Sequence, residues 1–152
     1  MAHNISQKSY DMEGDTMTKR VYDHELDFLD DLTCIFQGIP FTGISCEYWP
    51  SGRLRSEIFF KDGVQHGKAV EWYESGQKKS ESEYRNNDVH GICREWYENS
   101  MLKQEDLYEF GIEIYHRTWS EEGTLLESRE IKGNSSNFNL LKKWRAFEKG
   151  QI

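Results

Sequence analysis

Two histidines and one cysteine are the residues of this sequence best suited to chemistry. His90, Cys93 and Glu95 stand close together, and an imidazole beside a thiol could activate it as a nucleophile. His66 lies 24 positions before His90, and both histidines directly precede a glycine. This period favours a role in turn geometry, because the residues of a single active site rarely recur at a fixed spacing.

No further group completes a site around Cys93. The sequence has no second cysteine at metal-ligand spacing, no oriented acid for a nucleophile triad, no phosphate-binding glycine loop and no paired Cys-x-x-Cys motif. We therefore predict no catalytic residue, no metal ligand and no cofactor, and we expect a binding protein. An enzyme that relies on Cys93 and His90 is kept as an alternative.

The balance of charge narrows the range of partners. The chain has 152 residues and a formal net charge of −8, which argues against nucleic acid and anionic membranes, because both require a basic surface. A protein partner with a basic surface is the natural expectation. The three cysteines fit a reducing compartment, and neither an apolar leader nor a membrane-length apolar segment occurs. We expect a cytoplasmic protein.

One pattern of sequence recurs with a period of 24 residues. Glycines at positions 43, 67 and 91 are each followed by a glutamate, an aromatic pair and a glycine or serine turn. A degenerate fourth copy, TWSEEGTLLESREI, occupies 118–131, and CIFQGIPFTG at 34–43 supplies half a copy before the array. A fixed period of this length indicates stacked supersecondary units, each unable to bury its apolar face alone.

Each copy is typical of a β-hairpin. A β-favouring run such as GKAVEWY precedes a glycine turn, a second run such as KKSESEYR and a second turn such as NNDVHG. The fold class that we predict is mainly β: an elongated antiparallel β-hairpin meander of 24-residue repeats with a C-terminal capping α-helix. Only 36% of the residues are hydrophobic, so we expect a thin structure.

Alternation along the strands separates two sets of side chains. We expect one set to be buried: Tyr48, Trp72, Trp96 and Trp119 in the first strands, and Leu54, Ile58, Phe60, Tyr84, Leu102 and Tyr108 in the second. The opposite parity of the first strands carries a repeated glutamate and a second aromatic residue. Acids flanked by aromatics suit a protein interface, but repeated glutamates and tyrosines also brace cross-strand pairs, and both interpretations stay open.

The repeat resembles a known family. Its order of glutamate, aromatic pair, Ser-Gly turn, Lys-x-Glu, aromatic residue and His-Gly is similar to the bacterial variant of the MORN repeat, above all to the YwqK family of antitoxin and immunity proteins. The opening GIPFTG at 38–43 is also similar. The resemblance covers roughly residues 30–131, with Ser100 in place of a turn glycine and a fourth copy that lacks His-Gly. It implies a curved sheet of successive hairpins and a cytosolic partner of a toxin.

From this resemblance we predict an antitoxin or immunity protein that neutralises a cognate bacterial toxin by occluding its active site. The candidate toxin-binding residues are Glu47, Trp49, Glu71, Tyr73, Glu95 and Tyr97. The alternative function is a MORN-type scaffold or membrane-associated protein-interaction module, although the basic or apolar patch that it requires is not visible. We expect a cognate toxin domain as partner, and neither nucleic acid nor membrane.

The two ends of the chain differ from the repeats. We predict an acidic N-terminal segment over 1–28 that is partly disordered or capping, with a partner-binding arm as the alternative, the repeat array over 29–133 and a C-terminal helix within 134–152. Phe138, Leu141 and Trp144 stand at helical spacing before Gly150, which predicts a helix over 137–149. We expect this helix to cover the last repeat, and a toxin-binding helix is the alternative.

Overall fold

The structure, a computed structural model, describes residues 10–12 and 17–150, so the predicted acidic segment 1–28 lies partly outside the described residues. The strands are β1 (Tyr10–Met12), β2 (Met17–Tyr22), β3 (Asp27–Phe28), β4 (Cys34–Phe36), β5 (Ile39–Pro40), β6 (Gly43–Tyr48), β7 (Leu54–Lys61), β8 (Val64–Trp72), β9 (Lys78–Arg85), β10 (Asp88–Val89), β11 (Gly91–Trp96), β12 (Leu102–Glu109), β13 (Ile112–Trp119) and β14 (Leu125–Glu130). A short 3-10 turn, η1, spans Asp23–Glu25, and one helix, α1, spans Ser136–Glu148.

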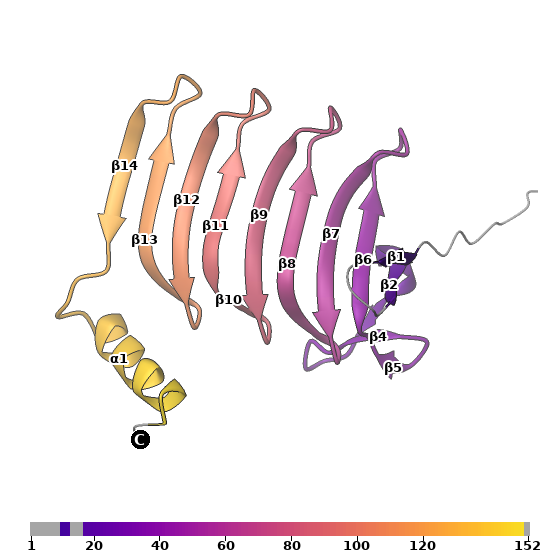
Figure 1. The fold of residues 1–152 in the computed structure, drawn as a ribbon, viewed down its shortest axis with the longest axis horizontal. Helices are drawn as coiled ribbons and strands as arrows, with labels where there is room; N and C mark the ends of the chain where they lie inside the picture. Colours follow the sequence, from indigo (N-terminus) through magenta and orange to yellow (C-terminus); the bar gives the residue numbers. More distant parts are fainter. Residues whose placement is uncertain (1–9, 13–16, 151–152) are drawn as a thin grey trace, which may run out of the picture.

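One long sheet contains the array, as Figure 1 shows. Its order is β1-β2-β6-β7-β8-β9-β11-β12-β13-β14, with β10 beside β9, while β3, β4 and β5 form a separate three-stranded sheet. Neighbouring strands are antiparallel except for β2, which runs parallel to β6. The predicted mainly β meander of hairpins with a C-terminal helix is confirmed.

Every hairpin of the array has a β-bulge at the same place. In the first hairpin the register passes from Glu47 opposite Ser56 to Tyr48 opposite Leu54, so Arg55 has no opposite residue. The same shift leaves Lys79, Lys103 and Leu126 as the extra residues of the later hairpins. A bulge of this kind redirects the extra side chain and reverses the alternation beyond it.

The bulges explain why the predicted burial is wrong. Leu54 and Leu102 lie opposite Tyr48 and Trp96, whereas the other second-strand residues of the expected set, Ile58, Phe60, Tyr84 and Tyr108, share the face of the repeated glutamates. Among the described residues, a second layer covers the sheet only at its N-terminal end, where Phe60 and Ile58 of β7 are packed. Tyr48 is 40% exposed, the three tryptophans are half-buried, and only Phe60 of the expected set is buried.

The buried core lies at the N-terminal end of the long sheet. Val21, Leu26, Cys34, Phe41 and Phe60 form it, and Phe36 and Ile58 pack against it. The small sheet β3-β4-β5 contributes Cys34, and β2 contributes Val21, so residues before the array are part of the folded unit. Burial raises the pKa of the Cys34 thiol to about 11, with a smaller effect from the charge of Asp23. All three cysteines are free, Cys34 and Cys46 being buried and Cys93 half-buried.

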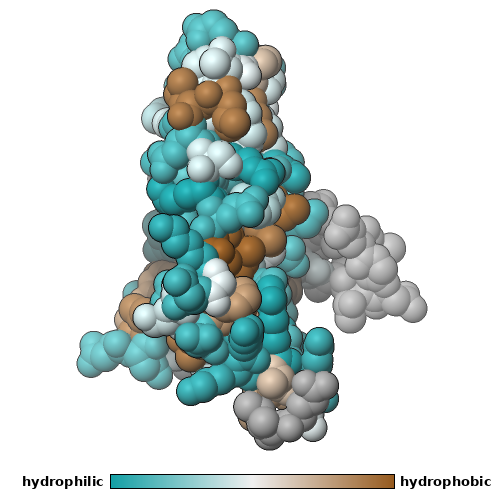
Figure 2. All heavy atoms as spheres, turned by 90° about the vertical axis from the view of Figure 1, so that its left-hand side faces the viewer, coloured by the Kyte–Doolittle hydropathy of each residue, from teal (hydrophilic) through white to brown (hydrophobic). Residues whose placement is uncertain are grey.

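The C-terminal helix lies beside the turns that connect the third repeat to its neighbours, one after β9 and one after β12. Ser135 caps its first turn by accepting a hydrogen bond from the N–H of Phe138. Arg145 makes two hydrogen bonds to Glu109 at 2.7 and 2.6 Å, and Trp144 stacks on Phe110. Every residue of β14 is exposed, so the helix covers these turns and not the edge strand. Figure 2 looks onto this end of the sheet and shows a narrow, mainly hydrophilic surface with separate hydrophobic patches. No helix among the described residues is long and apolar enough to cross a bilayer.

Candidate functional site

The six predicted toxin-binding residues lie on one face of the long sheet. The register places Glu47, Glu71 and Glu95 in one row that crosses the strands. Along this row each residue lies opposite the next, in the order Glu47, Ser56, Glu71, Ser80, Glu95 and Gln104. We call the three glutamates the glutamate column. Trp49, Tyr73 and Tyr97, the aromatic column, follow at the ends of the same strands, and Glu47, Trp49, Glu71 and Tyr73 line one surface depression.

Each glutamate of the column is neutralised by the residue at the bulge of its own hairpin. Arg55 donates to Glu47 at 2.8 Å, Lys79 to Glu71 at 2.9 Å and Lys103 to Glu95 at 2.9 Å. The bulge returns each cation to the glutamate face, which simple alternation would not do. These cations were missed from the sequence, although their spacing of 24 residues is visible there.

The aromatic column links each repeat to the next. The indole Nε1 of Trp49 donates to the carbonyl oxygen of Trp72 at 3.2 Å, and the phenol of Tyr73 donates to the carbonyl oxygen of Trp96 at 2.8 Å. Tyr97 repeats the contact with Trp119 at 3.0 Å. Because these bonds join strands from successive copies, they fix the stacking of hairpins, each with a net contribution of about 1 kcal/mol.

Cation–π contacts connect the two columns. The Arg55 guanidinium lies 4.9 Å from the centre of the Trp49 ring, and the Lys103 ammonium lies 5.9 Å from that of Tyr97. The hydrogen bond to Glu95 raises the pKa of Lys103. The glutamate, cation and aromatic residue of a repeat therefore form one unit with no net charge, and each ion pair is exposed enough to contribute at most about 1 kcal/mol. These contacts show how the six residues brace the sheet, and their contact with a toxin stays a prediction.

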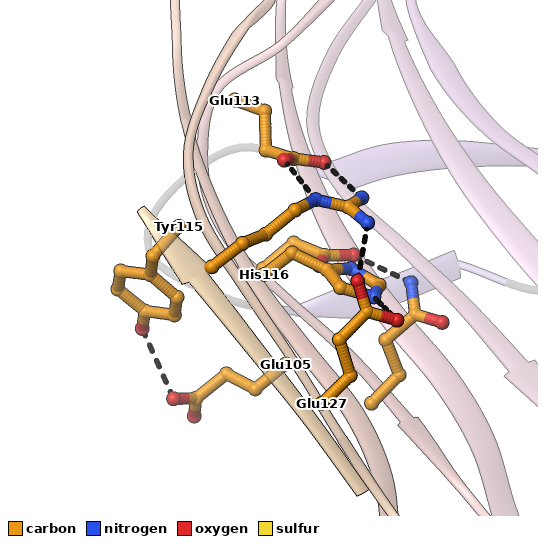
Figure 3. Close-up of polar contacts among 8 residues, drawn as sticks. Glu105, Glu113, Tyr115, His116 and Glu127 are labelled. Atoms are coloured by element: carbon orange, nitrogen blue, oxygen red, sulfur yellow. Dashed lines mark hydrogen bonds and ion pairs between the residues drawn. The ribbon is translucent and has the colours of Figure 1, made fainter. Parts of the chain in front are cut away.

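A second polar cluster joins β12, β13 and β14, as Figure 3 shows. Asp106, which is 4% exposed, contacts Nδ1 of His116 at 2.6 Å and accepts a hydrogen bond from Gln104 at 2.6 Å. Arg129 holds both oxygens of Glu113, at 2.9 and 3.1 Å, and also donates to Glu127. No periodic signal in the sequence indicates this cluster, because its residues come together only where the third and fourth copies meet.

The chemistry of this cluster is that of an ion-pair network. Asp106, Glu113 and His116 offer one ligand atom each within 4.8 Å of one another, which is the kind of set that holds a metal ion. However, Arg129 already supplies a positive charge to Glu113 by a bidentate contact, which lowers the pKa of that carboxyl group. The cluster thus ties the edge strand β14 to the array.

The histidine and cysteine residues singled out from the sequence are not brought together as a nucleophile site. Cys93 lies in β11 opposite Asp106. His90 packs edge-on against Phe110, and its Nδ1 accepts a hydrogen bond from the Phe110 N–H at 3.4 Å. His90 therefore joins two neighbouring hairpin turns, which agrees with the turn role expected from its period.

Comparisons with known proteins agree with the repeat boundaries. Residues 41–62, 65–86 and 89–109 match the family model of the MORN repeat variant, and these segments correspond to the hairpins β6–β7, β8–β9 and β11–β12. The chain is 51% identical over 142 residues to Immunity protein YwqK of Bacillus subtilis (strain 168), a match that spans 93% of this chain and 89% of that protein. No solved structure matches the chain significantly.

Proposed function

We propose that this chain, which belongs to the YwqK family of MORN-repeat variant proteins, is a cytosolic immunity protein that binds a cognate toxin domain and occludes its active site. The observation that carries the proposal is the identity of 51% to Immunity protein YwqK over nearly the whole of both chains. Similarity of this extent reaches beyond the repeats at both ends, because the matched repeats alone are much shorter than 142 residues. It suggests an immunity role that does not involve catalysis.

The architecture supports a role in protein binding. The array is one sheet thick, and the side chains on both of its faces are mostly half-buried or exposed, so a small chain presents a large surface. The only buried apolar cluster among the described residues lies at one end of the sheet. A protein of this shape can cover a substrate groove without a deep pocket of its own.

The charge supports a basic partner. The formal net charge is −8, and the glutamate column contributes little to the field because each of its acids is paired with a cation. The excess of acid therefore comes from positions outside the glutamate column. Toxin domains that act on nucleic acid present basic clefts, and an acidic inhibitor associates with such a cleft quickly through electrostatic steering.

The proposal is tested by expressing this chain together with the product of each gene adjacent to its own, to identify a cognate toxin domain. We expect a stable complex on gel filtration and survival of cells that the toxin domain alone kills. If no neighbouring product binds or becomes toxic when the gene is deleted, the proposed function is wrong.

Occlusion needs a separate measurement. A catalytically inactive toxin domain should bind the chain with unchanged affinity, and the toxin's substrate should compete with the chain for it. Binding that persists without change at saturating substrate would show that neutralisation occurs away from the active site.

A further inference from the structure

The turn between β3 and β4 exposes an unusual concentration of apolar side chains. We call Phe28–Leu32, with the sequence FLDDL, the FLDDL turn. Phe28 is 56% exposed, Leu29 49% and Leu32 68%. The ring of Phe28 meets Phe60 of the core edge-on at 6.2 Å, so the turn is anchored to the folded unit while its apolar tip faces outward.

The backbone of this turn is defined by three hydrogen bonds. The N–H of Leu29 donates to the carbonyl of Thr33 at 3.0 Å, and the N–H of Leu32 donates back to the carbonyl of Leu29 at 2.9 Å. Asp31 accepts a hydrogen bond from the N–H of Thr33 at 3.0 Å. These bonds hold the three apolar side chains in a fixed arrangement, which reduces the entropy lost when a partner binds.

Leu32 adopts a backbone conformation that leucine rarely takes. Its φ is +66°, in the left-handed region that glycine and asparagine adopt most readily. Phe110 is the other large apolar residue with positive φ in the described chain, and its ring packs against His90 and Trp144. Leu32 is 68% exposed, so its side chain gains little from folding that could offset the strain. The turn type imposes this φ, because the same two backbone hydrogen bonds occur around Gly52, which holds the place of Leu32 in the first repeat turn. A leucine at this place carries strain that a glycine would avoid, which points to a role for its exposed side chain.

Exposed acidic side chains lie within and directly before the FLDDL turn in the sequence. Residues 22–33 contain five acids and neither lysine nor arginine, and all five are exposed: Asp23, Glu25, Asp27, Asp30 and Asp31. The hydrogen bonds from Thr33 lower the pKa of Asp31, so its carboxylate remains charged at neutral pH. In contrast to the glutamate column, this surface is not neutralised by repeated cations. An apolar centre with a charged rim has the anatomy of a protein interface.

We propose that the FLDDL turn is the surface through which this chain contacts its cognate toxin domain, with Leu32 seated in an apolar depression that basic residues border. This inference rests on the immunity function proposed above. It places the specific contact at the unrepeated N-terminal end of the sheet.

The test measures binding to the purified, catalytically inactive toxin domain encoded beside the gene. Leu32→Asn removes the apolar side chain and suits the left-handed backbone, so we expect affinity to fall at least about tenfold while the melting temperature of the free chain stays equal or rises. The matched control is Leu126→Asn, because Leu126 is 65% exposed at the opposite end of the sheet. This control should bind as the wild type does.

The possible outcomes separate the two proposals. If the wild-type chain does not bind, the immunity function fails and this inference with it. If the wild type binds and Leu32→Asn binds equally well, the immunity function stands and the FLDDL turn is not the contact. If sedimentation shows that the wild type is a dimer and Leu32→Asn a monomer, the surface serves a second copy of the chain, and the inference is overturned.

The acidic rim gives an independent readout. Asp30→Asn should slow association with the toxin domain about twofold to fivefold and reduce the dependence of its rate on salt, because rim charges act on the encounter rate more than on dissociation. Glu98→Gln, an exposed acid in the turn after β11, serves as its control. Equal association rates for these two variants would contradict a role for the rim.

Discussion

Substitution of Gly43 tests how the N-terminal strand is joined to the array. Gly43 begins β6 with φ at +155°, which L side chains rarely adopt. A Cβ at this position would lie 2.3 Å from the carbonyl oxygen of Lys19 in β2 and 2.7 Å from Cζ of Phe41 in the core, whereas Cβ atoms essentially never come within 3.0 Å of such neighbours. Gly43→Ala therefore requires both β2 and the Phe41 ring to move away by several tenths of an ångström. Backbone strain of about 1–3 kcal/mol and overpacking of a similar size predict a loss of about 2–6 kcal/mol.

Gly52→Ala is the control for Gly43→Ala. Gly52 also has a positive φ, +82°, but nothing lies within 4 Å of its Cβ position, so it reports backbone strain alone. Urea denaturation should show that Gly43→Ala lowers the free energy of unfolding by about 2 kcal/mol more than the control, and the melting temperature by about 10 °C relative to wild type. Equal losses in the two variants would refute the close approach of β2 to β6.

Three further predictions concern the contacts of the array. Tyr73→Phe removes the phenol bond to the next repeat and should lower the free energy of unfolding by about 1 kcal/mol in urea denaturation; an unchanged value would argue against bracing by the aromatic column. The hydrogen bonds of Arg145 lower the pKa of Glu109, so the stability from this pair is complete above the ordinary value of 4.5 and is lost as pH falls below it. Unfolding free energies of wild type and Arg145→Met should differ by about 1 kcal/mol at pH 7 and converge as pH falls through the lowered pKa of Glu109. Thr118→Glu with Leu126→Lys recreates the missing fourth ion pair, and a double-mutant cycle should give a coupling of about 0.3–1 kcal/mol.

The fold could be predicted because the residues that favour each strand and each turn recur in several copies of the repeat. Glycine turns, β-favouring runs and a constant period fix the hairpin and its stacking, and the helix of Ser136–Glu148 was predicted within one residue at each end. The burial pattern could not be predicted, because the bulge in every hairpin reverses the alternation. The residues at the bulges, Arg55, Lys79 and Lys103, do recur in the sequence at a fixed period. This period indicates a bulge only when the cations are known to lie on the same face as their glutamate partners.

The candidate sites were predictable to a different extent. The six residues of the glutamate and aromatic columns were found from the period, and the structure places them on one face as expected from their parity. The cluster around Asp106 and His116 and the strained Leu32 were not found, because neither recurs. A hydrogen bond across strands and a positive φ in a leucine depend on backbone geometry that a single copy of a pattern does not reveal.

These contacts suggest different roles for repeated and unrepeated residues: the repeated residues stack the hairpins, and the unrepeated ones are suited to recognition. A residue that recurs at 24-residue intervals meets the same neighbours in each copy, so selection for stacking is sufficient to explain the glutamate column, its cations and the aromatic column. Recognition of one toxin needs the opposite property, a surface found once. The FLDDL turn has that property, since its strained leucine, its exposed apolar side chains and its unneutralised acids occur at one end of the array. Relatives that share the repeat but neutralise different toxins should therefore differ there more than along the columns.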